Sequence, residues 1–220
     1  MTQAEVLIDG KRLIPSDSPE YLASGPMSFE EFLDWEYEGG LTEWVDGEVF
    51  VYVTNNYEHQ VMLDFLHRLL GDWAELTGAG RVITAPYAIE SAHGGAGREP
   101  DLIFVATEHQ DRLQSRHLRG APDLAIEIVS PESVARDRVT KLREYERSGV
   151  PEYWVIDSRP RMRRAYFYSL QPSGSYEEIE VADGRMWSRV LEGFWLKLEW
   201  LWAADPKPLA ALREIMGGSL

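Results

Sequence analysis

The sequence predicts an α/β or α+β domain in which helices flank a mixed central β-sheet. An amphipathic stretch at residues 56–76 spaces its apolar residues as one face of a long helix does. Two short apolar runs, at 101–106 and 122–129, are typical of buried strands. A helix at 133–148, closed by Gly149, leads into a strand at 152–157. Helices that precede and interrupt the strands favour a mixed sheet.

Turn and capping signals predict the elements before this sheet. Ser28 and Glu31 have the spacing of a capping box, so we expect a helix that begins here and ends at Gly39-Gly40. The β-prone run at 42–52 is divided by Asp46-Gly47, a pair that favours a type I′ hairpin. Residues 81–90 are predicted to form a strand, and the glycine-rich residues 94–97 a flexible loop.

The C-terminal third alternates apolar and polar residues as the strands of a meander do. We expect strands at 165–170, 175–181 and 194–200, and a short helix at 208–216. With 220 residues, 44% of them hydrophobic, the chain suits one compact domain with tails. We place an arm at 1–27 with little regular structure, the domain at 28–204, and a C-terminal helix or tail at 205–220.

Composition excludes several classes of function. The chain has no cysteine, so disulfides, thiolate metal sites and cysteine nucleophiles are absent. The first residues lack the apolar core of a signal peptide, and no apolar run is long enough to span a membrane. We therefore expect a cytoplasmic protein with no membrane association.

The chain is strongly acidic, with 22 basic and 37 acidic residues and a formal net charge of −15. Such a charge repels a polyanion over most of the surface, which weighs against general nucleic-acid coating. The net charge does not exclude a local strip of basic residues that binds nucleic acid. The alternative is that the basic side chains are simply solvated. The basic residues that cluster are Arg112, Arg116 and Arg119, then Arg136, Arg138, Lys141 and Arg143, and then Arg159, Arg161, Arg163 and Arg164.

Two acidic residues stand in the apolar strands, Asp101 at the start of one and Glu127 within the other. A buried carboxylate costs several kcal/mol unless a cation or a dense set of hydrogen bonds compensates it. If the strands pair, two such acids about 4 Å apart repel by roughly 4 kcal/mol at an effective dielectric near 20. A divalent cation relieves that repulsion, and hard oxygen ligands select magnesium or manganese. The alternative is that the strands lie at a sheet edge and the acids face water.

The helix that follows the second strand carries Asp137, Lys141 and Tyr145 along one face, at i, i+4 and i+8. A lysine beside two metal-bound carboxylates can orient an attacking water and offset charge on a phosphate. By itself, however, a helical lysine is also compatible with an ordinary surface position.

An ordered set of residues resembles one known family. The set comprises Glu43 with Asp46-Gly47, His59, Pro100-Asp101, the run 122–131 around Glu127, Lys141 with Tyr145, and the run 149–157. It is similar to the Uma-two family of restriction endonuclease-like proteins, a branch of the PD-(D/E)XK nuclease superfamily, over about residues 28–202.

This resemblance implies a restriction-endonuclease-like sheet on which Asp101, Glu127 and the Ile128 carbonyl hold Mg²⁺ or Mn²⁺. The superfamily places a lysine two residues after the second acid, where this chain has Val129. The resemblance supplies Lys141 from the next helix instead. Glu43 matches an acidic residue early in the family's sequence, which implies that it completes the outer part of the metal site. The alternative is that Glu43 only flanks the hairpin at Asp46-Gly47.

Whether His59, Asp137 and Tyr145 belong to this site stays open at this point. Two functions follow from the resemblance. The first is a magnesium-dependent endonuclease that hydrolyses DNA phosphodiester bonds and meets DNA through a local basic strip. The alternative, which the net charge of −15 favours, is a catalytically inactive nuclease fold that acts as a binding or regulatory module. Because cutting two strands needs two sites, we also expect a possible homodimer, with the C-terminal tryptophans as an apolar contact.

Overall fold

The structure is a computed structural model that describes residues 6–8, 11–15, 21–23, 27–35, 41–52, 57–90, 96–129, 140–159 and 162–218, with only the backbone before residue 27. The helices are α1 (Phe29–Asp34), α2 (Tyr57–Thr77), the 3₁₀ helix η1 (Thr107–Arg112), α3 (Lys141–Ser148), α4 (Leu198–Leu201) and α5 (Pro208–Ile215). The strands are β1 (Val6–Ile8), β2 (Lys11–Pro15), β3 (Tyr21–Ala23), β4 (Leu41–Val45), β5 (Glu48–Tyr52), β6 (Gly80–Thr84), β7 (Ala88–Glu90), β8 (Ala96–Arg98), β9 (Leu102–Ala106), β10 (His117–Arg119), β11 (Leu124–Val129), β12 (Glu152–Asp157), β13 (Arg164–Leu170), β14 (Tyr176–Glu178), β15 (Val181–Ala182), β16 (Arg185–Trp187) and β17 (Trp195–Lys197).

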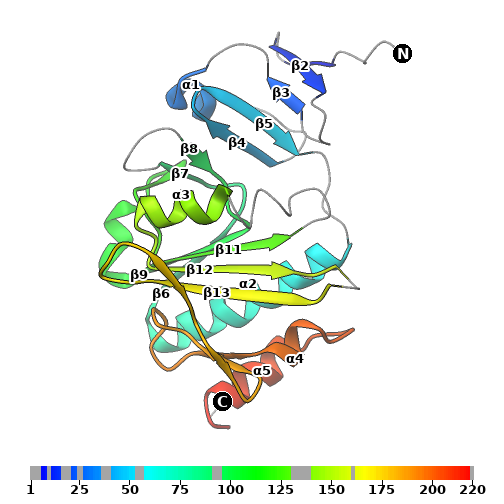
Figure 1. Cartoon of the computed structure of the whole chain (residues 1–220), viewed down its shortest axis with the longest axis vertical. Helices are drawn as coiled ribbons and strands as arrows, with labels where there is room; N and C mark the ends of the chain where they lie inside the picture. Colours follow the sequence, from blue (N-terminus) through cyan, green and yellow to red (C-terminus); the bar gives the residue numbers. More distant parts are fainter. Residues whose placement is uncertain are drawn as a thin grey trace.

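A six-stranded mixed sheet lies at the centre of the molecule, in the order β14-β13-β12-β11-β9-β6 (Figure 1). The pair β11 and β12 is parallel, and the other neighbouring pairs are antiparallel. All six side chains of β11 and all six of β12 are buried, as expected of strands covered on both faces. The sheet is therefore the mixed, helix-flanked sheet that the sequence predicts.

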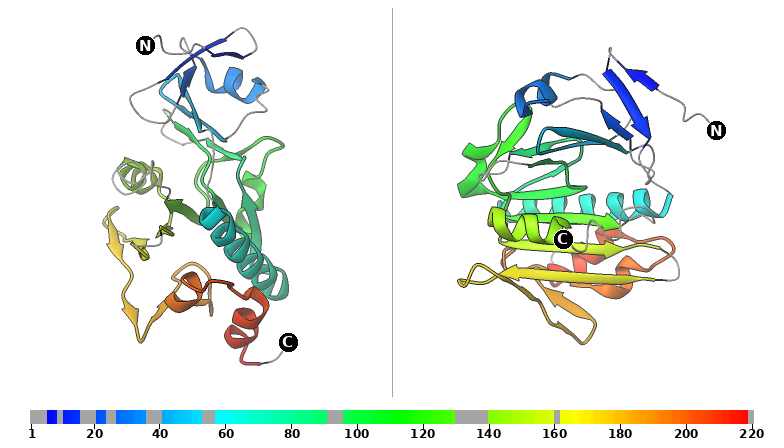
Figure 2. Two further views of the ribbon diagram at one scale, coloured as in Figure 1. Left: turned by 90° about the vertical axis from the view of Figure 1, so that its right-hand side faces the viewer. Right: turned by 45° about the horizontal axis from the view of Figure 1, so that its top comes forward.

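Alternate residues of the central strands face two different hydrophobic clusters. Leu124, Ile126 and Ile128 of β11 pack with the apolar face of α2 and with α5. Ala125 and Val129 pack on the other side with Tyr145 of α3. Figure 2 shows α2 and α3 on opposite sides of the sheet. Because side chains alternate along a strand, Glu127 belongs to the face that α3 covers.

A second sheet has the order β1-β2-β3-β5-β4-β8-β7-β10 and lies above the central sheet in Figure 1. Strand β4 pairs with both β5 and β8, so this sheet brings Glu43 and Arg98 close to α3. A third sheet, β15-β16-β17, follows the central one in the chain. Its buried residues Met186 and Leu196 extend the core around α2.

Local signals are confirmed at the hairpin and at α1. Asp46 and Gly47 have φ angles of 50° and 92°, as a type I′ turn requires, and the Ser28–Glu31 capping box is present. Other details differ from the prediction. The expected strand at 194–200 ends at Lys197, and α4 follows it. The expected strand at 81–90 is divided into β6 and β7 at Pro86, which has no N–H to donate to a ladder. Residues 96–98, expected in part as loop, form β8, and the arm at 1–27 includes β1, β2 and β3.

The predicted helix at 133–148 is seen as α3 from Lys141, and residues 130–139, with Asp137, lie outside the described residues. None of the described helices is both long enough and apolar enough to cross a membrane.

Candidate metal-dependent active site

Glu127 is the centre of a group of buried polar side chains. It lies on β11, a fully buried strand of the central sheet, and only 4% of its surface is exposed. Its Oε1 atom accepts a hydrogen bond of 2.8 Å from the Lys141 ammonium and one of 2.7 Å from the Tyr145 hydroxyl. Burial raises the pKa of Tyr145 well above its usual value, so this hydroxyl is a proton donor. Helix α3 thus supplies both partners, one turn apart.

Lys141 bridges two carboxylates that come from different sheets. Its Nζ atom lies 2.8 Å from Oε1 of Glu127 and 2.7 Å from Oε1 of Glu43 on β4. All three side chains are at most 5% exposed. The ammonium therefore separates two acids that would otherwise repel each other in a region of low dielectric.

Arg98 extends this group into a continuous chain of charges. Its guanidinium donates to Oε2 of Glu43 at 2.7 Å, and it holds Glu144 of α3 through two bonds of 2.8 and 2.9 Å. Burial lowers the pKa of Arg98, but the Glu43 and Glu144 carboxylates outweigh burial and raise it above its usual value. A permanently charged arginine therefore fixes β4, β8 and α3 relative to one another.

Asp101 lies immediately before β9, on the strand next to Glu127. Leu102 pairs with Ile126 across the antiparallel ladder, so Asp101 lies beside Glu127 along these strands. One Asp101 oxygen accepts the Ile128 backbone N–H at 2.7 Å, and the other lies 3.0 Å from Nε2 of His59. His59 belongs to the first turn of α2. The structure thus brings His59 to the predicted site, through Asp101.

Glu99 is an additional acid beside the site. It accepts a bond of 3.3 Å from the backbone of Thr42. The pKa of Glu99 is raised to about 8, chiefly by burial; the Thr42 bond and Lys141 lower it, and Glu43 raises it. Glu99 is therefore mostly protonated at pH 7.

Acidic side chains outnumber basic ones among the described residues of this group. The acids are Glu43, Asp101, Glu127 and the half-buried Glu144, and the basic side chains are Lys141 and Arg98. A divalent cation is a ligand that such a set of carboxylates suits.

The donors available to such a cation are hard oxygens. Within the described ranges, no three His, Asp or Glu side chains are grouped to hold one metal ion. The set of two carboxylates, Asp101 and Glu127, with the Ile128 carbonyl stays a prediction.

Sequence reasoning found part of this group and missed the rest. Glu43, Glu127, Lys141 and Tyr145 are in direct contact, as expected of one site. Arg98 and Glu144, which complete the charge chain, were not singled out. Arg98 follows a glycine-rich segment that resembles a loop, and only the pairing of β8 with β4 and β7 explains its burial.

Comparison with known proteins agrees with this geometry. The family model of Uma2, described as "Putative restriction endonuclease", matches residues 29–199. The chain belongs to the Uma2 family. No protein of curated function matches it.

Among solved structures, "a putative nuclease belonging to DUF820 from Anabaena variabilis" is similar to this chain. The TM-score is 0.66 and the identity 17%, and the match covers 80% of this chain and 98% of the other. The likeness confirms the restriction-endonuclease-like architecture. The Uma2 match spans every residue of the buried charge group, from Glu43 to Tyr145.

Proposed function

We propose that this Uma2 protein is a metal-dependent endonuclease that hydrolyses DNA phosphodiester bonds. The observation that carries the proposal is the convergence of three predicted residues in one buried group. Lys141 contacts Glu127, and Asp101 lies beside Glu127 on the next strand. An acid, an acid and a lysine on strand, strand and helix suit phosphodiester hydrolysis. Family membership supports a nuclease.

In this proposal Asp101, Glu127 and the Ile128 carbonyl hold Mg²⁺ or Mn²⁺. When bound, the cation acts as a Lewis acid toward phosphate oxygens and lowers the pKa of bound water. Lys141 orients the attacking water and offsets negative charge on the phosphate. Glu43 holds Lys141 from the opposite side, and Arg98 in turn holds Glu43.

A cleavage assay tests the proposal. Purified protein is incubated with supercoiled plasmid, linear duplex, single-stranded DNA and RNA, with Mg²⁺ or Mn²⁺ and with EDTA. We expect metal-dependent nicking or cutting that Asp101→Ala and Lys141→Ala both abolish. Lys207→Ala, which removes the exposed lysine at the N-cap of α5, is the control and keeps full activity. Equal residual cleavage by wild type and by both site variants would reveal a contaminating nuclease and refute the proposal.

A second function is favoured by one observation. Lys141 bridges Glu43 and Glu127, and Arg98 bridges Glu43 and Glu144, so basic side chains of the chain itself partner three of these acids. This arrangement suits a structural network in an inactive binding or regulatory module. Calorimetric titration with Mn²⁺ separates the two functions. An endonuclease gives binding heat that Asp101→Asn removes, whereas an inactive module gives none. The homodimer stays a prediction, which light scattering on the purified chain tests.

A further inference from the structure

Arg164 lies on the same face of the central sheet as Glu127. The ladder places Val129 opposite Asp157, and Asp157 opposite Arg164. One step back along the same face, Glu127 lies opposite Val155. Residues directly opposite each other in neighbouring strands point to the same face. Arg164 is exposed there, whereas Asp157 is fully buried.

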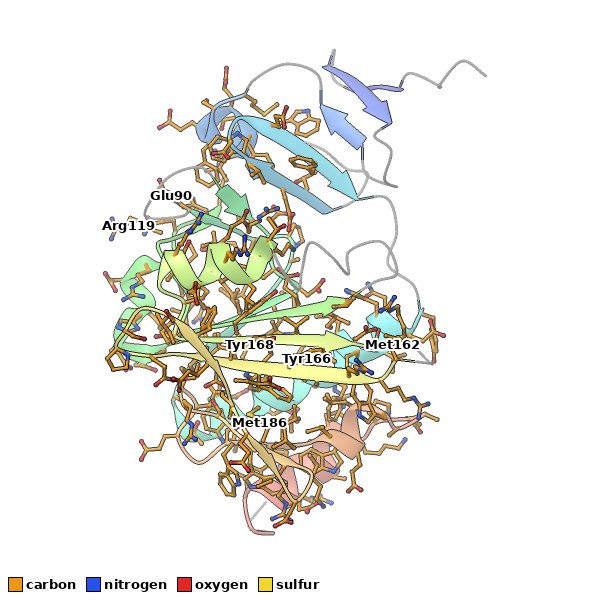
Figure 3. All side chains as sticks on the ribbon, viewed as in Figure 1. Glu90, Arg119, Met162, Tyr166, Tyr168 and Met186 are labelled. Atoms are coloured by element: carbon orange, nitrogen blue, oxygen red, sulfur yellow. The ribbon has the colours of Figure 1, made fainter. Side chains whose placement is uncertain are left out.

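The described residues of the turn that precede Arg164 are joined by hydrogen bonds. Arg159 grips Asp157 with two bonds of 2.8 and 2.7 Å, and its carbonyl accepts the N–H groups of Met162 and Arg163. Arg163 adopts a φ of 39°, which is unusual for a residue other than glycine. Figure 3 shows Met162 at the end of the sheet where β13 begins.

This turn is positively charged in a strongly acidic protein. Among its described residues, three arginines, at 159, 163 and 164, against Asp157 alone give a charge of +2, while the whole chain carries −15. Asp157 forms an ion pair with Arg159. Within the described part of the chain, no carboxylate forms an ion pair with Arg164. A local excess of positive charge is what such a chain needs to meet a polyanion.

The spacing from Glu127 suits a nucleic-acid strand. Two strand spacings of about 4.8 Å and two residues of about 3.3 Å separate the Cα atoms of Glu127 and Arg164, which gives roughly 12 Å. Phosphates of one DNA strand rise by about 3.4 Å each along the helix axis and are farther apart in a straight line, so this distance spans at most about four nucleotides.

We propose that Arg164 binds a phosphate of the substrate backbone within about four nucleotides of the scissile phosphate. The Asp157–Arg159 pair then serves as a positioning device that fixes the turn. The inference deepens the proposed endonuclease function and rests on it.

Salt dependence of binding tests this contact. Binding of a fluorescent 30-nucleotide DNA, single-stranded or duplex, is followed by anisotropy between 50 and 200 mM NaCl in EDTA, so that nothing is cleaved. Arg164→Ala is compared with Arg164→Lys and with Arg213→Ala. Arg213 is an exposed arginine on α5, which packs on α2 and so lies beyond the opposite face of the sheet. Thermal melting of each variant verifies that it is folded.

Losing one phosphate contact lowers the slope of log Kd against log salt by about 0.9 for duplex and about 0.7 for single strands. At 0.1 M salt that slope corresponds to roughly eightfold weaker duplex binding. We expect this loss for Arg164→Ala, with Arg164→Lys and Arg213→Ala close to wild type. If the wild type cuts DNA but Arg164→Ala has the same salt slope as the wild type, the Arg164 contact is refuted and the endonuclease proposal is unaffected.

Two further outcomes separate the contact from the enzyme. Wild type that binds DNA with the predicted Arg164 dependence, but cleaves nothing with either metal, supports the contact and contradicts the endonuclease. Wild type that neither binds nor cuts nucleic acid overturns both.

Discussion

Replacing Lys141 with methionine removes one charge from the centre of the buried group and leaves an unbranched side chain that is one atom shorter. In the native protein the ammonium lies 2.7 Å from Glu43 and 2.8 Å from Glu127. Their Oε1 atoms are therefore at most 2.7 + 2.8 = 5.5 Å apart. At that distance two carboxylates repel by about 3 kcal/mol with an effective dielectric of 20. This agrees with the 3 to 5 kcal/mol typical of breaking a buried ion pair from one side.

The assay is urea unfolding in EDTA, repeated with Mn²⁺. Lys141→Met should lose about 3 kcal/mol, or roughly 6 to 12 °C in melting temperature. Mn²⁺ should raise the free energy of unfolding of the variant more than that of the wild type, because the cation replaces the missing positive charge. Lys207→Met, which breaks an exposed pair with Asp205, is the control and should cost less than about 1 kcal/mol. A Lys141→Met protein as stable as this control would refute the reasoning.

Three further changes test other parts of the structure. Glu152 accepts four hydrogen bonds, and burial raises its pKa, so its protonated form is stabilised by folding. This contribution to the free energy of unfolding is complete below pH 4.5 and is lost as the pH rises through the raised pKa. The stability difference between wild type and Glu152→Gln in thermal melts should therefore narrow as the pH rises above 4.5. Tyr145→Phe removes a donor to ionised Glu127 and should cost about 2 kcal/mol in urea unfolding. Gly80→Ala should cost about 2 kcal/mol by calorimetry, because its Cβ would meet the Val105 carbonyl, whereas full stability would show that β6 can move.

Local sequence patterns predict the elements that carry the site. Glu127 interrupts an apolar run, and that conflict between residue type and burial is readable without a structure. Helical spacing predicts only that Lys141 and Tyr145 share one face of a helix, and the structure places both on Glu127. The hairpin beside Glu43 follows from its Asp-Gly turn, because a two-residue turn depends only on its own residues.

Long-range contacts are the part that could not be predicted. Arg98 reaches Glu43 over 55 residues and Glu144 over 46 residues, and its own neighbours resemble a glycine-rich loop. The pairing of β8 with β4 and β7 makes it a buried residue. The same limit applies to β1–β3, where short strands gain their stability from neighbours far along the chain.

The central claim is that Asp101 and Glu127 share one divalent cation. A crystal of the full chain soaked in Mn²⁺ and measured at the manganese absorption edge tests it most directly. We predict one anomalous peak bonded to both carboxylates and to the Ile128 carbonyl, at ligand distances typical of a metal bound by oxygen. An anomalous map without that peak at saturating Mn²⁺, or a peak that touches only one of the two acids, would contradict the claim.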